Sequence, residues 1–357
     1  MTPRSKTRGP LPRPDYSRLS RYDPGRRPVE VDLSDNTNLW GTHPAALAAI
    51  QAADVDALAR YPSLYADRLR EVVAGRHGVE PTEVTTGCGS DDVLDSLWRA
   101  LAEDGGIVSY AAPTFSMVEP LSRMNGRTAR GVPWSVALAK PEALFESDPV
   151  MVYICRPNNP TGHLAPLSWV ERVLELAGDS GPVVLLDEAY ADFAGETLIP
   201  MAVQHPRAMV VRTLSKAYGL AGLRVGYGIG TEGLIAEVEK SRGPYKVGRL
   251  AEAAACAALI DAAGWVAGTI DQAVANRYRL IEELTARGVK TLPSGANFVM
   301  VPVEAGAAVE TAVALRRHDV GVRPFPACPD VGDAVRVTVG PWPLMERFLA
   351  AWDACSA

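Results

Sequence analysis

The sequence predicts an α/β fold: a large domain with a mostly parallel sheet flanked by helices, followed by a smaller α+β domain. Short runs rich in Val and Ile occur at 107–112, 150–155, 183–187, 209–213 and 225–229. Amphipathic segments of helix length separate these runs. Because the runs are apolar on both faces, they are typical of parallel strands that helices cover on both sides.

The elements fall into three segments along the chain. Residues 1–42 are predicted to form an N-terminal arm that is partly flexible, because the stretch 1–28 is rich in Pro and Arg and has no apolar period. Residues 43–250 hold the strands and helices of the large domain. Residues 251–357 begin with an Ala-rich helical region and continue with two strand-like stretches, TLPSGANFVMVPV and AVRVTVG, around another helix, which predicts a small α+β domain.

Composition and charge narrow the function. Apolar residues make up 47% of the 357 residues and charged residues 22%, and no run of 18 apolar residues could cross a bilayer. The net charge of −6 argues against a general partner of nucleic acid or of an anionic membrane, so the substrate is expected to be a small molecule. The five cysteines are scattered and form no CxxC pair, which indicates reduced thiols in the cytoplasm. The five histidines are scattered too, and we expect no metal site.

The first candidate site is the start of a helix. In TTGCGSDDVLDSLWRAL, residues 85–101, a strand end passes through Gly89 into a helix that begins with Ser90 and Asp91. Ligands in open α/β sheets bind beyond the carboxyl ends of the strands, and free N–H groups at such a helix terminus can hold a phosphate. An ordinary capped helix after a glycine turn is the alternative interpretation.

Other polar positions follow or interrupt apolar runs. A cluster of turn residues that includes Asn159 follows one run, and by composition alone it needs to be no more than a turn. Asp187 ends another run; a buried carboxylate needs a cation, either in a site or in a structural ion pair. Lys216 follows a third run. Arg336 lies inside the Val-rich stretch AVRVTVG, where an inward arginine must meet an anion and an outward one has no such need.

Together these positions match one cofactor. Pyridoxal 5'-phosphate needs a lysine for a Schiff base, an acid for its pyridine nitrogen, a phosphate cradle at a helix terminus and a donor to its phenolic oxygen. The chain resembles the fold-type I pyridoxal-phosphate-dependent aminotransferases of class I/II, and within them the histidinol-phosphate aminotransferase family. The resemblance spans nearly the whole chain and lies in GCGSDD, APTFSM, RPNNPTG, DEAYADF, TLSKAYGLAGLRVGY, RYP at 60–62 and VRVTVG at 335–340.

The resemblance implies a role for each matching residue. Lys216 would form the Schiff base and then move a proton at the substrate Cα, Asp187 would pair with the pyridine nitrogen, and Tyr190 would bond the phenolic oxygen. The implied cofactor-binding set is Gly89, Ser90, Asp91, Phe115, Asn159, Asp187, Tyr190, Ser215, Lys216 and Arg224, with Tyr61 reaching the phosphate from the neighbouring subunit. The family's site therefore implies a homodimer with shared active sites.

The same resemblance implies a cytoplasmic transferase of histidine biosynthesis. Histidinol phosphate and 2-oxoglutarate would give imidazole acetol phosphate and glutamate. Arg336 would hold the polar end of the substrate, Tyr22 and Arg323 would bind its phosphate, and Asn159 and Trp40 would also face it.

Three departures from the family pattern are expected to concern the substrate. The family's NENPYG reads NTNLWG at 36–41, which brings Trp40 into the region that lines the substrate pocket; Arg156 precedes the NNPTG turn; and PYNVN reads PYKVG at 244–248. These changes leave the cofactor residues intact. Transamination of another amino donor (aromatic, basic or a biosynthetic intermediate) and a decarboxylase or oxidase on the same scaffold therefore stay open.

Two other classes of protein stay open as well. GIGTEG at 228–233 fits the GxGxxG pattern of a dinucleotide-binding dehydrogenase, although that interpretation leaves Asp187, Lys216 and NNPTG without a shared purpose. A protein that holds the cofactor without turnover, such as the sensor domain of a regulator, is the other. No helix-turn-helix segment accompanies it, and the net charge is wrong for DNA.

Overall fold

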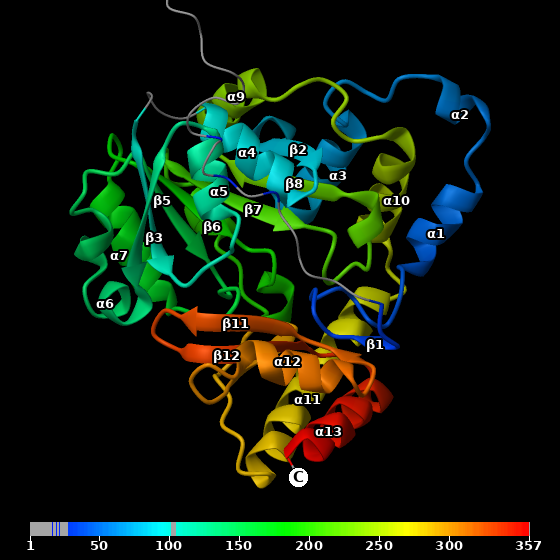
Figure 1. Ribbon diagram of the computed structural model, residues 1–357. Coiled ribbons are helices and arrows are strands. Elements are labelled where there is room, and N and C mark those ends of the chain that lie inside the picture. The colour runs from blue at the N-terminus through cyan, green and yellow to red at the C-terminus, as the bar shows by residue number, and fades with distance from the viewer. Residues whose placement is uncertain (1–15, 17–18, 20, 22–27, 101–104, 357) are drawn as a thin grey trace, which may run out of the picture.

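The computed structural model describes residues 16, 19, 21, 28–100 and 105–356. They form a large part around a seven-stranded sheet and a smaller part around a three-stranded sheet, which lies below it in Figure 1. The predicted α/β class with a mostly parallel sheet is confirmed. The first sheet falls within 43–250 and the second within 251–357, the two predicted domains, whose boundaries stay a prediction. The predicted arm lies largely outside the described residues.

The large sheet has the strand order β2-β8-β7-β6-β5-β3-β4. The five strands from β7 to β4 are parallel, whereas β8 is antiparallel to both β2 and β7. The bounds are β2 Val84–Cys88, β3 Ile107–Ala112, β4 Thr128–Pro133, β5 Met151–Cys155, β6 Val183–Asp187, β7 Ala208–Thr213 and β8 Val225–Gly230.

The direction of β8 differs from the parallel direction that its two apolar faces predicted. Only residues 214–224 join β7 to β8, and a parallel pair needs a crossover of a dozen residues or more. The GxGxxG match begins in this antiparallel strand, where a Cβ on Gly228 would lie 2.0 Å from Met209 Cε. The glycine therefore lets neighbouring side chains pack closely against the strand, and the parallel strand of a dinucleotide-binding unit is not formed here.

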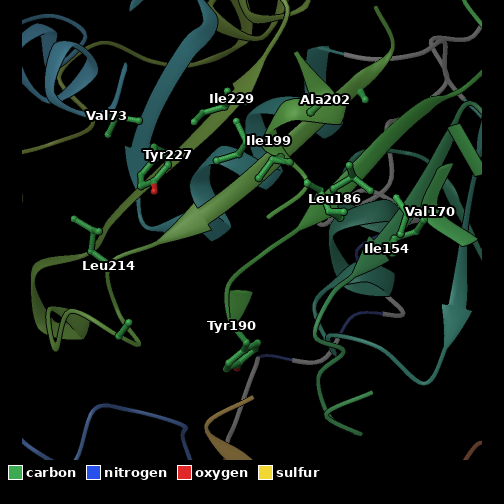
Figure 2. Close-up of a cluster of buried hydrophobic side chains, with 14 of the residues drawn as sticks. Val73, Ile154, Val170, Leu186, Tyr190, Ile199, Ala202, Leu214, Tyr227 and Ile229 are labelled. Carbon is green, nitrogen blue, oxygen red and sulfur yellow. The ribbon is translucent and has the colours of Figure 1, made fainter. Parts of the chain in front are cut away.

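Helices cover both faces of this sheet (Figure 1). The bounds on one face are α4 Ser90–Ala100, α5 Val118–Met124 and α9 Glu232–Ser241; on and around the other they are α1 Pro44–Gln51, α2 Asp56–Ala59, α3 Asp67–His77, α6 Trp134–Ala139, α7 Leu167–Ala177, α8 Ile199–Ala202 and α10 Arg249–Ile260. Strand residues alternate between the two cores, as a period of two requires. Ile154 and Leu186 face the second core, shown in Figure 2, whereas Tyr153 faces the first.

The smaller part contains the antiparallel sheet β11-β12-β9. Its bounds are β9 Phe298–Pro302, β11 Arg323–Cys328, β12 Gly332–Thr338, α11 Trp265–Ala286, α12 Ala308–Arg316 and α13 Trp342–Ser356. The end of the arm joins it, because β1 (Val31–Asp32) pairs in parallel with β10 (Val320–Gly321) and Leu33 is buried in the same apolar core. This pairing fixes the path of the residues that follow β1.

None of the described helices alone has both the length and the apolarity that a membrane span needs. The pair α10 and α11 does, by length and composition, but the two helices bend by 75° at the break between them.

Candidate active site

A cavity of about 990 Å³ lies between the carboxyl ends of β5, β6 and β7 and the hairpin of β11 and β12. Parallel strands end at one edge of a sheet, so polar residues far apart in the sequence meet there. The lining contains most of the predicted site residues: Ser90, Asp91, Phe115, Asn159, Asp187, Tyr190, Ser215, Lys216, Arg224, Arg323 and Arg336. In the part of the chain that the structure describes, no group of three His, Cys, Asp or Glu side chains has the arrangement of a metal site.

Asp187 is the buried acid of the cavity. It ends β6, and its Oδ2 accepts a hydrogen bond of 2.5 Å from the Tyr153 hydroxyl, while its Oδ1 accepts one of 3.0 Å from the Ala189 amide. Burial raises the pKa of Asp187 to about 6, and the two hydrogen bonds act in the opposite direction. A cation bound in the cavity next to this carboxyl group would therefore stabilise its ionised form.

Three consecutive residues of the arm contact the site. Ser34 O accepts a hydrogen bond of 2.7 Å from Arg336 Nη2, and Asp35 O accepts one of 2.9 Å from Lys216 Nζ. Asn36 Nδ2 donates to the Tyr190 hydroxyl at 3.0 Å. The segment 34–36 thus orients one side chain each from β12, from the loop after β7 and from the loop after β6.

Asn36 is held firmly enough to orient its partner. It is 1% exposed, its backbone amide donates to Thr338 Oγ1 at 2.9 Å, and its φ of 55° is a left-handed conformation that Asn tolerates better than most residues. Because the Tyr190 hydroxyl accepts from Asn36, its own proton can be directed into the cavity. Burial raises the pKa of Tyr190 to about 12, which keeps this hydroxyl protonated.

An anion cradle forms at the N-terminus of α4. Its first N–H groups have no partners within the helix, which begins at Ser90 beside the Arg224 guanidinium. Arg224 donates to Asp91 Oδ2 at 3.2 Å and, more weakly, to Ser215 Oγ at 3.5 Å. A Cβ on Gly89, whose φ is 81°, would lie 2.4 Å from Arg224 Nη2, so this approach requires glycine.

Two arginines face each other at the far wall of the cavity. Arg323 and Arg336 are directly opposite in the register of β11 and β12, and both line the cavity. The Arg336 guanidinium donates to Asn159 Oδ1 and lies 5.2 Å from the ring centre of Phe298 and 5.4 Å from that of Phe325. Like charges directly opposite on neighbouring strands repel, and an anion between them removes that cost.

The remaining predicted site residues lie elsewhere. Trp40 is outside the cavity lining, and its Nε1 donates to Gln272 at 3.0 Å. Tyr61 is 78% exposed and stacks on Tyr245 with ring centres 4.8 Å apart, also outside this chain's own cavity. Tyr22 lies outside the described residues.

Of the departures from the family pattern, Thr37 in the stretch NTNLWG lines the cavity, whereas Arg156 and Lys246 do not. Arg156 is buried below the NNPTG turn, where its Nε donates to Ala165 O at 2.6 Å and its Nη2 pairs with Glu196. Lys246 Nζ lies 2.6 Å from Asp92 Oδ1, and the other oxygen of that carboxylate accepts from the Cys88 amide at 2.9 Å. These two residues therefore support the turn and the loop that precedes α4.

Sequence reasoning missed the segment 34–36 and Tyr153. Two of the three contacts from 34–36 are made by backbone carbonyls, which no side-chain pattern reveals. Tyr153 reads as an ordinary core residue in the run VMVYIC. The one usable signal was a polar cluster, Asp35 to Asn38, placed between an apolar arm segment and the first helix.

Comparison with known proteins finds aminotransferases that are similar over most of the chain. The family model for aminotransferase class I and II matches residues 28–351. A histidinol-phosphate aminotransferase of Aromatoleum aromaticum is 39% identical over 332 residues, which are 90% of this chain and 92% of that protein. Histidinol-phosphate aminotransferase 2 of Rhizobium meliloti is 36% identical over 346 residues, 95% of this chain and 97% of that protein.

A solved structure is similar over the same extent. The crystal structure of histidinol-phosphate aminotransferase from Sinorhizobium meliloti in complex with pyridoxal-5'-phosphate matches with a TM-score of 0.86 and 25% identity, and the match covers 98% of this chain and 99% of that one.

Proposed function

The chain belongs to the class I and II aminotransferase family, and from that premise we propose that it is a pyridoxal-phosphate-dependent enzyme that transfers the amino group of histidinol phosphate to 2-oxoglutarate. One observation carries the proposal: a single cavity presents Lys216 and Asp187 on one side and the arginine pair Arg323 and Arg336 on the other. The first pair suits the cofactor, and the second suits a substrate with an anionic group.

The residues of the cavity fit the cofactor. The cradle at α4, in which Gly89 leaves room for the Arg224 guanidinium, suits a phosphate dianion. Asp187 would pair with the ring nitrogen, Phe115 would pack on the ring, and Asn159 and Tyr190 would bond its phenolic oxygen. The remaining phosphate contacts would come from Ser90, Asp91 and Ser215. When bound, pyridoxal phosphate supplies an aldehyde carbon that condenses with amines and a ring that accepts electrons from the substrate Cα.

The chain's own residues then move the proton. Lys216 Nζ would take the proton from the substrate Cα and deliver it to the cofactor carbon, as a base close to both atoms can. The Asp35 carbonyl, 2.9 Å from Nζ, limits the positions that this amine can adopt. The Tyr190 hydroxyl, oriented by Asn36, would hold its proton toward the phenolic oxygen. Asp187 would remain ionised opposite the protonated ring nitrogen throughout.

The arginine pair supports a phosphorylated donor. A guanidinium is a planar fork that binds two oxygens of a phosphate or carboxylate, and two such forks face the same space here. Arg336 is already held by Asn159 and by the Ser34 carbonyl, so its fork meets the ligand in a fixed orientation. The phosphate is the anionic group of histidinol phosphate, and a donor that lacks it, such as histidinol, offers the two forks no anion.

The test of the reaction is a coupled assay on the purified chain loaded with pyridoxal phosphate. Histidinol phosphate and 2-oxoglutarate should yield glutamate at a kcat/KM well above that for aromatic or basic amino acids. A higher kcat/KM for one of those donors would replace the substrate, and release of carbon dioxide without glutamate would indicate a decarboxylase.

Arg323→Ala should raise KM for histidinol phosphate by about a hundredfold, because one charge-assisted contact to the phosphate is lost. KM for histidinol, which has the same amine but no phosphate, should change by less than about threefold. Arg323→Lys is the matched control: it keeps the charge but not the fork, and we expect an intermediate KM. Equal effects of Arg323→Ala on both donors would contradict a phosphate pocket.

We also propose that the enzyme is a cytoplasmic homodimer. Val55 is 85% exposed, Leu58 70% and Tyr61 78%, and Tyr61 stacks on Tyr245 at the surface. So many exposed apolar side chains near one another favour an interface, and a second copy would bring Tyr61 to the phosphate cradle of its neighbour. The described cysteines are all free thiols, which agrees with a reducing compartment.

Mixing two variants tests the shared site. Tyr61→Ala should weaken pyridoxal phosphate binding by about tenfold, and Lys216→Ala should be inactive. In a hybrid dimer one site combines Lys216 of one chain with Tyr61 of the other and is intact. At a low cofactor concentration the mixture should therefore be more active than the two variants assayed separately. An activity equal to their mean would contradict the shared site.

A further inference from the structure

Tyr153 makes a close contact to the buried acid of the site. Its hydroxyl donates to Asp187 Oδ2 at 2.5 Å, the short end of the range for an O–H donor and a carboxylate. The tyrosine is 0% exposed and the aspartate 5%. Because both groups are shielded from water, water does not compete for this hydrogen bond.

The sheet explains why the two side chains meet. β5 and β6 are parallel neighbours in which Cys155 is opposite Asp187 and Tyr153 is opposite Leu185. Tyr153 and Asp187 therefore point to the same face of the sheet, and Asp187 lies two residues beyond the position opposite Tyr153. The ring lies in the apolar core with its centre 6.1 Å from that of Trp98, which fixes the direction of the hydroxyl. Burial raises the pKa of Tyr153 well above its usual range, so the hydroxyl is a donor at neutral pH.

Asp187 depends on such donors. A buried carboxylate is costly unless hydrogen bonds satisfy it, and its contacts are the Tyr153 hydroxyl and the Ala189 amide. Only proline at position 189 would remove the backbone amide, and it would also restrict the loop backbone, so Tyr153 is the partner that substitution can change selectively. The titratable groups around this carboxyl come from several elements: Tyr153 and Cys155 on β5, Asp91 on α4, Tyr190 after β6 and Lys216 after β7.

We propose that Tyr153 is a positioning residue for the reaction, whose hydroxyl keeps the Asp187 carboxylate ionised and aimed into the cavity. This role rests on the proposed function, because it acts through the pairing of Asp187 with the cofactor's ring nitrogen. This positioning role depends on the hydroxyl of Tyr153, whereas a packing role would depend on its ring.

Tyr153→Phe tests the role because it removes the hydroxyl and leaves the ring. The measurement is the dissociation constant of pyridoxal phosphate as a function of pH, followed by absorbance. Without this donor the carboxyl should protonate at a higher pH, so the acid limb of the binding profile should move upward by about one pH unit. The dissociation constant should rise about tenfold well below pH 6 and about twofold near neutral pH, and kcat should fall with little change in KM.

Tyr227→Phe is the matched control. Tyr227 is a buried tyrosine of the same sheet, 1% exposed, whose hydroxyl contacts His77 Nε2 at 3.0 Å and not Asp187. This variant should lose a comparable amount of stability but keep the pH profile of the unmodified chain. If the two variants have the same profile, or if Tyr153→Phe keeps the wild-type profile, the positioning role is wrong.

Failure of the proposed function would look different. The unmodified chain itself would then either not bind pyridoxal phosphate or bind it without transferring the amino group of histidinol phosphate to 2-oxoglutarate. If Tyr153→Phe folds but binds pyridoxal phosphate too weakly to measure, the role is judged by the pH at which the unfolding midpoint of the cofactor-free variant changes. A change at the same pH as in the cofactor-free parent chain overturns the proposal, and a change at higher pH supports it.

Discussion

Replacing Lys216 with alanine should lower kcat for transamination by about four orders of magnitude or more, which is the upper end of what a single proton-transfer group contributes. The reason is geometric. Lys216 is the lysine that lines the cavity, and its Nζ is held 2.9 Å from the Asp35 carbonyl, within the same cavity as Asp187. No other cavity-lining residue among those described is an amine.

Two measurements check this prediction. The purified parent chain should be yellow, and borohydride treatment should fix the cofactor on the peptide that contains Lys216, whereas Lys216→Ala should show neither property. Lys216→Arg is the matched control, because it keeps a positive charge near Asp187 but cannot serve as a base. Small primary amines should restore part of the activity to Lys216→Ala. An arginine variant with more than about a tenth of the parent's kcat would refute the assignment.

The sheet could be predicted where apolar runs are continuous. The runs at 107–112, 150–155, 183–187, 209–213 and 225–229 all became strands. The run of β4, TARGVP, was not predicted, because the strand is at the sheet edge, two of its residues (Thr128 and Arg130) are polar, and only Val132 is buried. The direction of β8 was set by the length of the connection to β7, a feature that apolar pattern does not carry.

The site could be predicted where its residues follow strands directly. Asp187 and Lys216 lie just after apolar runs, and the topology of a parallel sheet brings such positions together. The segment 34–36 depends instead on the pairing of β1 with β10, almost three hundred residues apart in sequence. Trp40 was expected at the substrate because of its position in NTNLWG, but a hydrogen bond to Gln272 of α11 holds its indole away from the cavity wall.

Asp187→Asn should abolish most of the activity and yet change the stability of the cofactor-free chain in a direction that depends on pH. An amide cannot pair as an anion with the protonated ring nitrogen, so kcat should fall by about three orders of magnitude or more. The ionised carboxyl of Asp187, in contrast, lowers the free energy of unfolding of the cofactor-free chain, because burial raises its pKa from 3.8 to about 6.

Proton linkage determines how the free energy of unfolding changes with pH. Between pH 3.8 and about 6 the folded chain binds more protons at this carboxyl than the unfolded chain does, so the free energy of unfolding falls as the pH rises through this window. Above that window, keeping the buried carboxyl ionised costs about 3 kcal/mol. Asparagine removes this cost. Its amide group can accept from Tyr153 or from Ala189 but not from both, which costs about 1 kcal/mol.

The cofactor-free variant should therefore be more stable than the parent chain by about 2 kcal/mol near pH 8, and less stable by about 1 kcal/mol near pH 4, where no ionisation cost is left to remove. Urea unfolding at the two pH values measures both differences. Asp192→Asn is the matched control, because Asp192 follows the same strand but pairs with Arg212 outside the cavity, and it should destabilise the chain at the higher pH. A variant at position 187 that is less stable than the parent at both pH values would show that the carboxyl is not under strain in the folded chain, and that its selection for function costs no stability.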